Sequence, residues 1–155
     1  MQMTRKAAQY YTFRNGPDRA QRVWQTSDGR TASYAAVQAE IQAAAQTYSY
    51  TYRMVVSTKE VDIREEGYRA ALGDRFDRYY FIEHHNTAYP HAHVLGFCQE
   101  RLTTGELQAM RGKVRALEQV RGPEQQRQRD PLQEPARHPA RDHASTAREF
   151  DQGLG

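Results

Sequence analysis

The sequence predicts an α+β fold with an antiparallel central sheet and helices packed on one face of that sheet. Two observations lead to this prediction. Short runs of aromatic, β-branched and aliphatic residues, which are typical of strands, alternate along the chain with longer segments of helical periodicity. Turn-forming residues, such as those at positions 15–18, separate several of these runs. The expected order is strand, strand, helix, strand, helix, strand, strand, helix.

The first half of the chain is expected to contain three strands and two helices. The expected strands are residues 8–13, 21–25 and 50–57. Thr31 or Ser33 is a suitable N-cap for the first helix, because a hydroxyl oxygen accepts a hydrogen bond from an unpaired backbone N–H. The apolar residues of that helix recur on one face: Tyr34, Val37, Ile41, Ala44 and Ala45. Residues 62–65 have the form of a capping box and predict a second helix that runs to residue 71 or 72.

The second half is expected to contain two strands, one helix and a tail. Residues 79–84 and 91–97 predict the strands, and Pro90 closes the connection between them. Residues 103–106 start the last helix. Its apolar stripe consists of Leu107, Met110, Val114 and Leu117. Residues 121–155 hold four of the six prolines and few large apolar residues, so we expect a disordered tail after a single domain of residues 1–120.

Composition narrows the classes of partner and compartment. No run approaches the roughly 20 apolar residues that span a bilayer, and no signal peptide is recognisable, so we expect a cytoplasmic protein with no membrane partner. The single cysteine, Cys98, ends an apolar run and is interpreted as a buried thiol in a reducing compartment. The net charge is +3, basic residues gather in the first thirty positions, and arginine dominates over lysine. Arginine favours bidentate phosphate contacts, so nucleic acid is a plausible partner.

Four of the six histidines lie within the ten residues from His84 to His93. Side chains alternate along a strand, so His91 and His93 should share one face. A hairpin would bring His84 beside them, although a shift of one residue would exchange His84 with His85. Three converging imidazoles can hold a divalent metal and leave positions open for a substrate. The alternative is that these histidines are packed side chains with no ligand.

Histidine-triad nucleotide hydrolases are a second class of proteins with closely spaced histidines. That class has a further alternating histidine at the position where this chain has Leu95. The sequence therefore disfavours it.

Several segments together resemble a known family over roughly residues 8–118. They are Val55-Val56-Ser57, His84, Pro90-His91-Ala92-His93-Val94, and Leu102-Thr103 with Leu107 and Arg111. In this combination the chain resembles plasmid mobilisation relaxases of the HUH endonuclease superfamily. The resemblance implies that His84, His91 and His93 bind a divalent metal, Mg²⁺ or Mn²⁺, beside a phosphate of single-stranded DNA. The family often has Asp two residues after the first histidine, where this chain has Asn86.

The resemblance also implies a tyrosine nucleophile. Relaxases carry it near the N-terminus in a segment such as Tyr-x-x-Arg, which here is Tyr11-Thr12-Phe13-Arg14. Tyr10 is the alternative, because neighbouring residues of a strand face opposite ways and only one of the two tyrosines could reach the metal. Other branches of the superfamily carry the tyrosine after the histidine pair, where this chain has none. Both tyrosines could also be ordinary strand residues.

The resemblance predicts that the protein nicks and religates single-stranded DNA at a transfer origin, through a 5′-phosphotyrosine intermediate. Several basic or hydroxyl side chains would contact the DNA: Lys6, Arg14, Arg19, Arg22 and Ser57. Trp24 would either stack on unpaired bases or lie in the core. Because the chain is short for a relaxase, the alternative is a non-catalytic DNA-binding or relaxosome accessory protein on the same scaffold. Relaxosome proteins are therefore possible partners.

Overall fold

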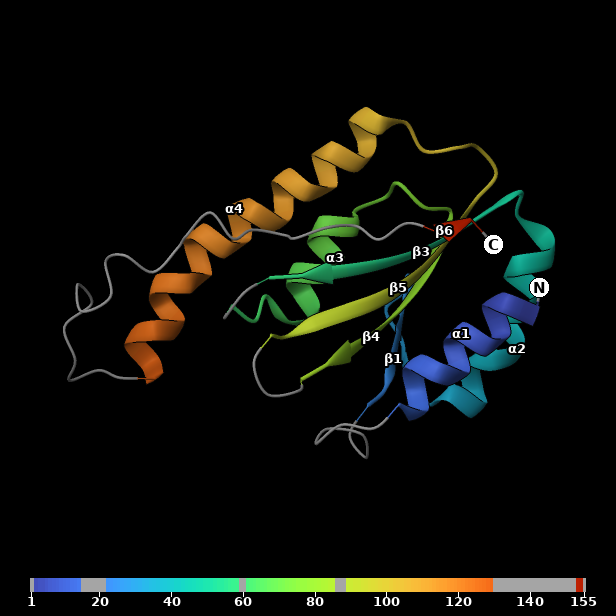
Figure 1. Ribbon diagram of the computed structural model, residues 1–155, viewed down its shortest axis with the longest axis horizontal. Helices are drawn as coiled ribbons and strands as arrows, with labels where there is room; N and C mark the ends of the chain where they lie inside the picture. The colour runs from blue at the N-terminus through green and yellow to red at the C-terminus, as the bar shows by residue number, and fades with distance from the viewer. Residues whose placement is uncertain (1, 15–21, 59–60, 86–88, 130–152, 155) are drawn as a thin grey trace.

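The computed structural model describes residues 2–14, 22–58, 61–85, 89–129 and 153–154 (Figure 1). The helices are α1 (Gln2–Phe13), α2 (Tyr34–Thr47), α3 (Arg64–Leu72) and α4 (Thr104–Arg129). The strands are β1 (Trp24–Thr26), β2 (Thr31–Ala32), β3 (Tyr50–Ser57), β4 (Arg78–His84), β5 (His91–Cys98) and β6 (Gly153–Leu154). The predicted α+β class is confirmed.

The strands form one antiparallel sheet in the order β2-β1-β4-β5-β3-β6. In this order β5 lies between β4 and β3. The register aligns His91 with His84 on one side and with Ser57 on the other. Two residues further along β5, and on the same face, His93 lies opposite Val55. Directly opposed residues share a face of the sheet, so these rows decide which side chains meet.

Helices cover both faces of the sheet, and the prediction of helices on one face is wrong. On one face α1 and α2 pack over a core that includes Trp24, Ile82 and Leu95. On the other, α3 and α4 pack over a core that includes Met54 and Phe81. The physical reason is that β4 and β5 are buried at almost every position, so neither face can be left to water.

The segment 8–13, predicted to be a strand, is the second half of α1. Thr4, Ala8 and Thr12 are buried at helical spacing, and this periodicity is visible only when the whole segment from residue 2 is considered. The Trp24 indole N–H donates to Thr12 Oγ1 at 2.8 Å, and the Thr12 hydroxyl donates to the Ala8 carbonyl oxygen at 2.8 Å. These two bonds fix α1 against β1.

The other predicted elements agree with the structure more closely. Ser33 caps α2 and accepts from the Ala36 N–H, and the predicted strand 50–57 is β3. At the start of α4, Thr103 and Glu106 exchange backbone-to-side-chain hydrogen bonds, each at 3.0 Å, which is a capping box. The predicted strand 21–25 corresponds to the shorter β1. Cys98 is buried, as predicted, and this burial raises the pKa of its thiol to about 11.

The predicted domain boundary at residue 120 falls inside α4. The helix continues through Pro123 to Arg129, because Gln, Glu and Arg are good helix formers and its last turns contact the α3 entry. The Arg121 guanidinium donates to the Ile63 carbonyl, and Gln125 Oε1 accepts from the Asp62 N–H at 3.0 Å. Of the predicted disordered tail, residues 130–152 lie outside the described ranges, and residues 153–154 pair with β3.

Among the described residues, no helix is both long enough and apolar enough to span a membrane.

Candidate metal centre

His84, His91 and His93 converge on the face of the sheet that α1 covers. Their ring centroids are 5.1 Å apart for His84 and His91, 4.6 Å for His84 and His93, and 5.0 Å for His91 and His93. One ring nitrogen from each histidine lies within 4.8 Å of the others. The three imidazoles therefore form a compact triangle that could hold one metal ion.

The register of the sheet produces this triangle. His84 lies directly opposite His91, at adjacent ends of β4 and β5, and His93 follows two residues along β5 on the same face. His85 does not join them, because the alternation of side chains turns it toward the other face. The structure thus selects the register in which His84, and not His85, belongs to the group.

Backbone carbonyls orient two of the three imidazoles. His84 Nε2 lies 2.8 Å from the carbonyl oxygen of Tyr11, and His91 Nδ1 lies 3.0 Å from that of Tyr89. A carbonyl oxygen only accepts, so each of these ring nitrogens carries a proton and donates it. In the neutral imidazole the lone pair is then on Nδ1 of His84 and Nε2 of His91. Carbonyl partners of this kind commonly orient metal-binding histidines.

His93 has no such partner. Its Nδ1 and Nε2 are both buried and make no hydrogen bond within the described residues. Burial is the largest influence on this side chain and, with the nearby imidazoles of His84 and His91, it lowers the pKa of His93 to about 2. His93 is therefore neutral at ordinary pH and has a lone pair for a ligand. A buried polar group without a partner costs about 1–3 kcal/mol, which a bound metal would offset.

The donor set fits a divalent metal. Neutral imidazole nitrogens are good ligands for Mn²⁺, Zn²⁺, Co²⁺ and Ni²⁺, and three of them leave coordination positions open. Mg²⁺ prefers oxygen ligands and a full octahedron, so it fits this set only with water or phosphate oxygens completing the shell. Of the two predicted metals, the donor set therefore favours Mn²⁺.

The structure separates the two candidate nucleophiles, Tyr10 and Tyr11. The Tyr11 ring stacks on the His93 ring, with centroids 4.1 Å apart and planes inclined by 13°. Tyr10 is 60% exposed and meets the edge of Tyr11 at a centroid distance of 6.2 Å. The sequence argument for one tyrosine assumed a strand, but in a helix neighbouring residues point about 100° apart, and this also separates the two rings.

Three of the predicted DNA-binding side chains lie near this face. Ser57 is half-buried at the end of β3, directly opposite His91. Lys6 is exposed on α1, one turn before Tyr10. Arg14 lies just after α1, with its guanidinium carbon 5.9 Å from the centre of the Tyr10 ring.

Two further predicted contacts, Arg22 and Trp24, do not lie at an exposed site. The Arg22 side chain is buried and donates to the carbonyl oxygens of Thr12 and Arg14, so it caps the end of α1 instead of presenting a charge to solvent. Trp24 is completely buried, and of its two predicted roles the structure supports the core position. Arg19 and Asn86 lie outside the described residues.

A second titratable group, which the sequence analysis missed, lies on the opposite face. His85 is placed between two carboxylates, with Nδ1 3.5 Å from Asp62 Oδ2 and Nε2 3.4 Å from Glu83 Oε1. Their ligand atoms also lie within 4.8 Å of one another. Strand alternation signals that Glu83 and His85 share a face, but no local pattern reveals Asp62, which comes from the loop before α3. Desolvation raises the pKa of Glu83, and the neighbouring His85 opposes this shift.

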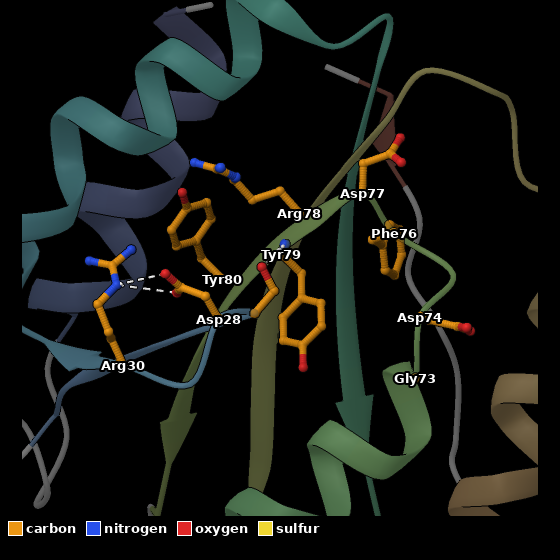
Figure 2. A pocket seen from close by; sticks show the side chains of 10 residues that line it. Asp28, Arg30, Gly73, Asp74, Phe76, Asp77, Arg78, Tyr79 and Tyr80 are labelled. Carbon is orange, nitrogen blue, oxygen red and sulfur yellow. Dashed lines mark hydrogen bonds and ion pairs between the residues drawn. The ribbon is translucent and has the colours of Figure 1, made fainter.

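A surface pocket lies at the other end of β4, beside Arg78 (Figure 2). Several of its charged side chains are paired among themselves or with neighbours. Arg30 forms ion pairs with Asp28 at 3.0 Å and with Glu40 at 2.7 Å, and Tyr80 donates to Glu40 at 3.2 Å. These contacts satisfy the groups that would bind a ligand, so the pocket is not the candidate site.

No family model, no curated protein and no solved structure matches this chain. The motifs of the sequence and the geometry of the site are therefore the observations that bear on function.

Proposed function

We propose that this protein is a metal-dependent nuclease that nicks and religates single-stranded DNA at a transfer origin by tyrosine transesterification. The observation that carries the proposal is the stacking of Tyr11 on His93, one member of a three-histidine group with a donor set suited to a divalent metal. A tyrosine and a metal site placed together supply the two components that such a reaction needs.

The order of the site residues along the chain is further support. The sequence first has a tyrosine near the N-terminus and then a serine at the end of a strand. One histidine follows, and after it comes a Pro-His-x-His segment. This is the pattern on which the resemblance to plasmid mobilisation relaxases depends. Ser57 and His91 are adjacent across the sheet, so two of these motifs meet at one place.

The proposed step is an exchange of phosphodiester bonds. Tyr11 Oη attacks the phosphorus, an O–P bond forms to tyrosine, and the bond from phosphorus to the 3′ oxygen breaks. The phenolic proton is lost and the departing 3′ oxygen gains one, which leaves a 3′-hydroxyl and a 5′-phosphotyrosine. Because one ester replaces another, the 3′-hydroxyl can attack in reverse and reseal the strand.

The residues of the site have separate roles in this proposal. His84, His91 and His93 would hold the metal, which when bound polarises the phosphate oxygens and stabilises the charge that develops on them. The packing of α1 on the sheet places Tyr11 against His93 and so reduces the freedom that the nucleophile must lose before attack. The Ser57 hydroxyl is placed to donate to a backbone phosphate beside His91.

A denaturing gel tests the proposal. Purified protein is mixed with labelled single-stranded DNA that spans a transfer origin, with Mn²⁺ or with EDTA. We expect a covalent DNA–protein band that requires Mn²⁺, disappears in Tyr11→Phe and His91→Ala, and remains in the matched control Tyr10→Phe. Binding without any adduct would contradict the nuclease proposal and favour the accessory DNA-binding protein.

A further inference from the structure

Arg53 lies in the middle of β3, and its guanidinium is not fully satisfied by the described residues. Its side chain is half-buried and its Nε atom is buried with no hydrogen-bond partner. Within the described ranges no carboxylate forms an ion pair with it. A guanidinium nitrogen that loses water without gaining an acceptor is costly, and an anion bound at this position would supply that acceptor.

Three other described arginines that are partly or fully buried have hydrogen-bond acceptors. Arg22 donates to the carbonyl oxygens at the end of α1, Arg121 donates to the Ile63 carbonyl, and Arg69 pairs with Glu65 at 2.6 Å. In these three cases the fold supplies an acceptor to an arginine that it covers. Arg53 departs from that pattern and is the strongest sign of a missing ligand outside the histidine group.

The sheet register places Arg53 on the same face as the candidate metal centre. Arg53 lies opposite Leu95, whose side chain belongs to the core beneath α1 and α2. One row along, Val55 lies opposite His93, and in the next row Ser57 lies opposite His91. Rows on one face are spaced by about 6.7 Å, twice the rise per strand residue. Ser57 and Arg53 therefore lie along one edge of the centre, separated by two such intervals.

We propose that Arg53 binds a backbone phosphate of the single-stranded DNA, on the β3 side of the phosphate that reacts. The inference extends the proposed function, because it assigns the path of the bound strand from the histidine group along β3. The planar guanidinium can donate two parallel hydrogen bonds to a phosphate, and such a contact is independent of base sequence. Arg53 is thus a positioning residue. On this face of β3 it lies one side-chain position beyond Val55, which is opposite His93, while Ser57 lies beside His91.

The first test is the salt dependence of binding, measured in EDTA so that no chemistry occurs. The probe is a fluorescein-labelled single-stranded oligonucleotide, followed by anisotropy. We expect Arg53→Gln to weaken binding roughly 10-fold and to reduce the slope of log affinity against log salt by about 0.7, the value for one phosphate contact on a single strand. The matched control is Arg101→Gln, an exposed arginine just beyond the opposite end of β5, which should keep the wild-type slope.

Arg53→Lys provides a second readout. It retains the charge but loses the bidentate geometry, so we expect the wild-type slope with weaker binding. If Arg53→Gln shows the wild-type affinity and slope, or if Arg53→Gln and Arg101→Gln change them equally, the inference is wrong. A lower melting temperature for Arg53→Gln with unchanged DNA binding would also overturn it, because Arg53 would then have an internal partner.

The two proposals fail in different ways. If the wild type forms no covalent adduct but Arg53→Gln reduces the slope of log affinity against log salt, the nuclease proposal is wrong and the phosphate contact stands. If the adduct forms and the slope does not change, the nuclease proposal stands and the role of Arg53 is wrong.

Discussion

The two titratable groups at the end of β4 lie back to back on opposite faces of the sheet and differ in how their members are satisfied. The group on one face consists of His84, His91 and His93. Both ring nitrogens of His93 are buried and make no hydrogen bond with the described residues. On the other face, both ring nitrogens of His85 lie close to a carboxylate, one of Asp62 and one of Glu83. Both groups could hold a metal ion by geometry, but only the three-histidine group includes a buried imidazole, that of His93, with no hydrogen bond to the described residues.

The largest expected effect is the loss of metal binding when a histidine of the first group is removed. His91→Ala should weaken Mn²⁺ or Zn²⁺ binding by at least about 100-fold, because one of three imidazole ligands is gone. Isothermal titration calorimetry measures this directly. The matched control is His85→Ala on the opposite face, which should leave the affinity within about 3-fold of the wild type. An equal loss in both variants would show that the two groups do not differ as the structure indicates.

Removing the anchor of α1 should have the next largest effect. Thr12→Val leaves the Trp24 indole N–H buried without its acceptor, which costs about 1–3 kcal/mol in the free energy of unfolding. Urea denaturation measures the loss. The rate of adduct formation should fall as well, because Tyr11 is then held less firmly against His93. A Thr47→Val control removes a hydroxyl that bonds only within an exposed part of α2 and should be nearly neutral.

The metal-free protein should lose stability as the pH falls below about 6.5. The pKa of His93 is about 2 in the folded protein and 6.5 in the unfolded chain, so between these values only the unfolded chain takes up the proton. The free energy of unfolding should therefore fall by up to about 1.4 kcal/mol per pH unit from this residue. Urea denaturation in EDTA at several pH values checks this, and His93→Gln should reduce the slope. An unchanged slope in that variant would contradict the burial of a neutral His93.

The smallest expected effect belongs to the second group. His85→Ala removes two partly exposed contacts between an imidazole and a carboxylate, which together should contribute less than about 1 kcal/mol to stability. The contribution should shrink in 1 M salt, which screens such pairs. Thermal unfolding at low and high salt measures it. A loss above 2 kcal/mol, or an effect of metal that requires His85, would mean that this group is also a binding site.

The sequence predicted the three-histidine group well because its geometry is local. A two-residue period puts His91 and His93 on one face, and a hairpin that closes at Pro90 brings His84 to them. The same alternation explains why His85 faces the other way. Only the chain's own periodicity and one turn were needed for these conclusions.

Other features depended on contacts between distant segments. The second half of α1, residues 8–13, was predicted to be a strand, because this short window shows its aromatic residues but not the burial of Thr4, Ala8 and Thr12 at helical spacing. Asp62 joins His85 only because the loop before α3 packs against the end of β4. The extension of α4 beyond residue 120 depends on Gln125, which bonds to that same loop.

The most direct test of the central claim is to locate the DNA on the protein. The covalent adduct formed with Mn²⁺ would be digested with nuclease and trypsin, and the modified residue identified by tandem mass spectrometry. The account predicts a 5′-phosphonucleotide on Tyr11, the tyrosine stacked on His93, and none on Tyr10. Modification of Tyr10, or of any residue away from the three histidines, would contradict the claim that Tyr11 and the metal centre act together.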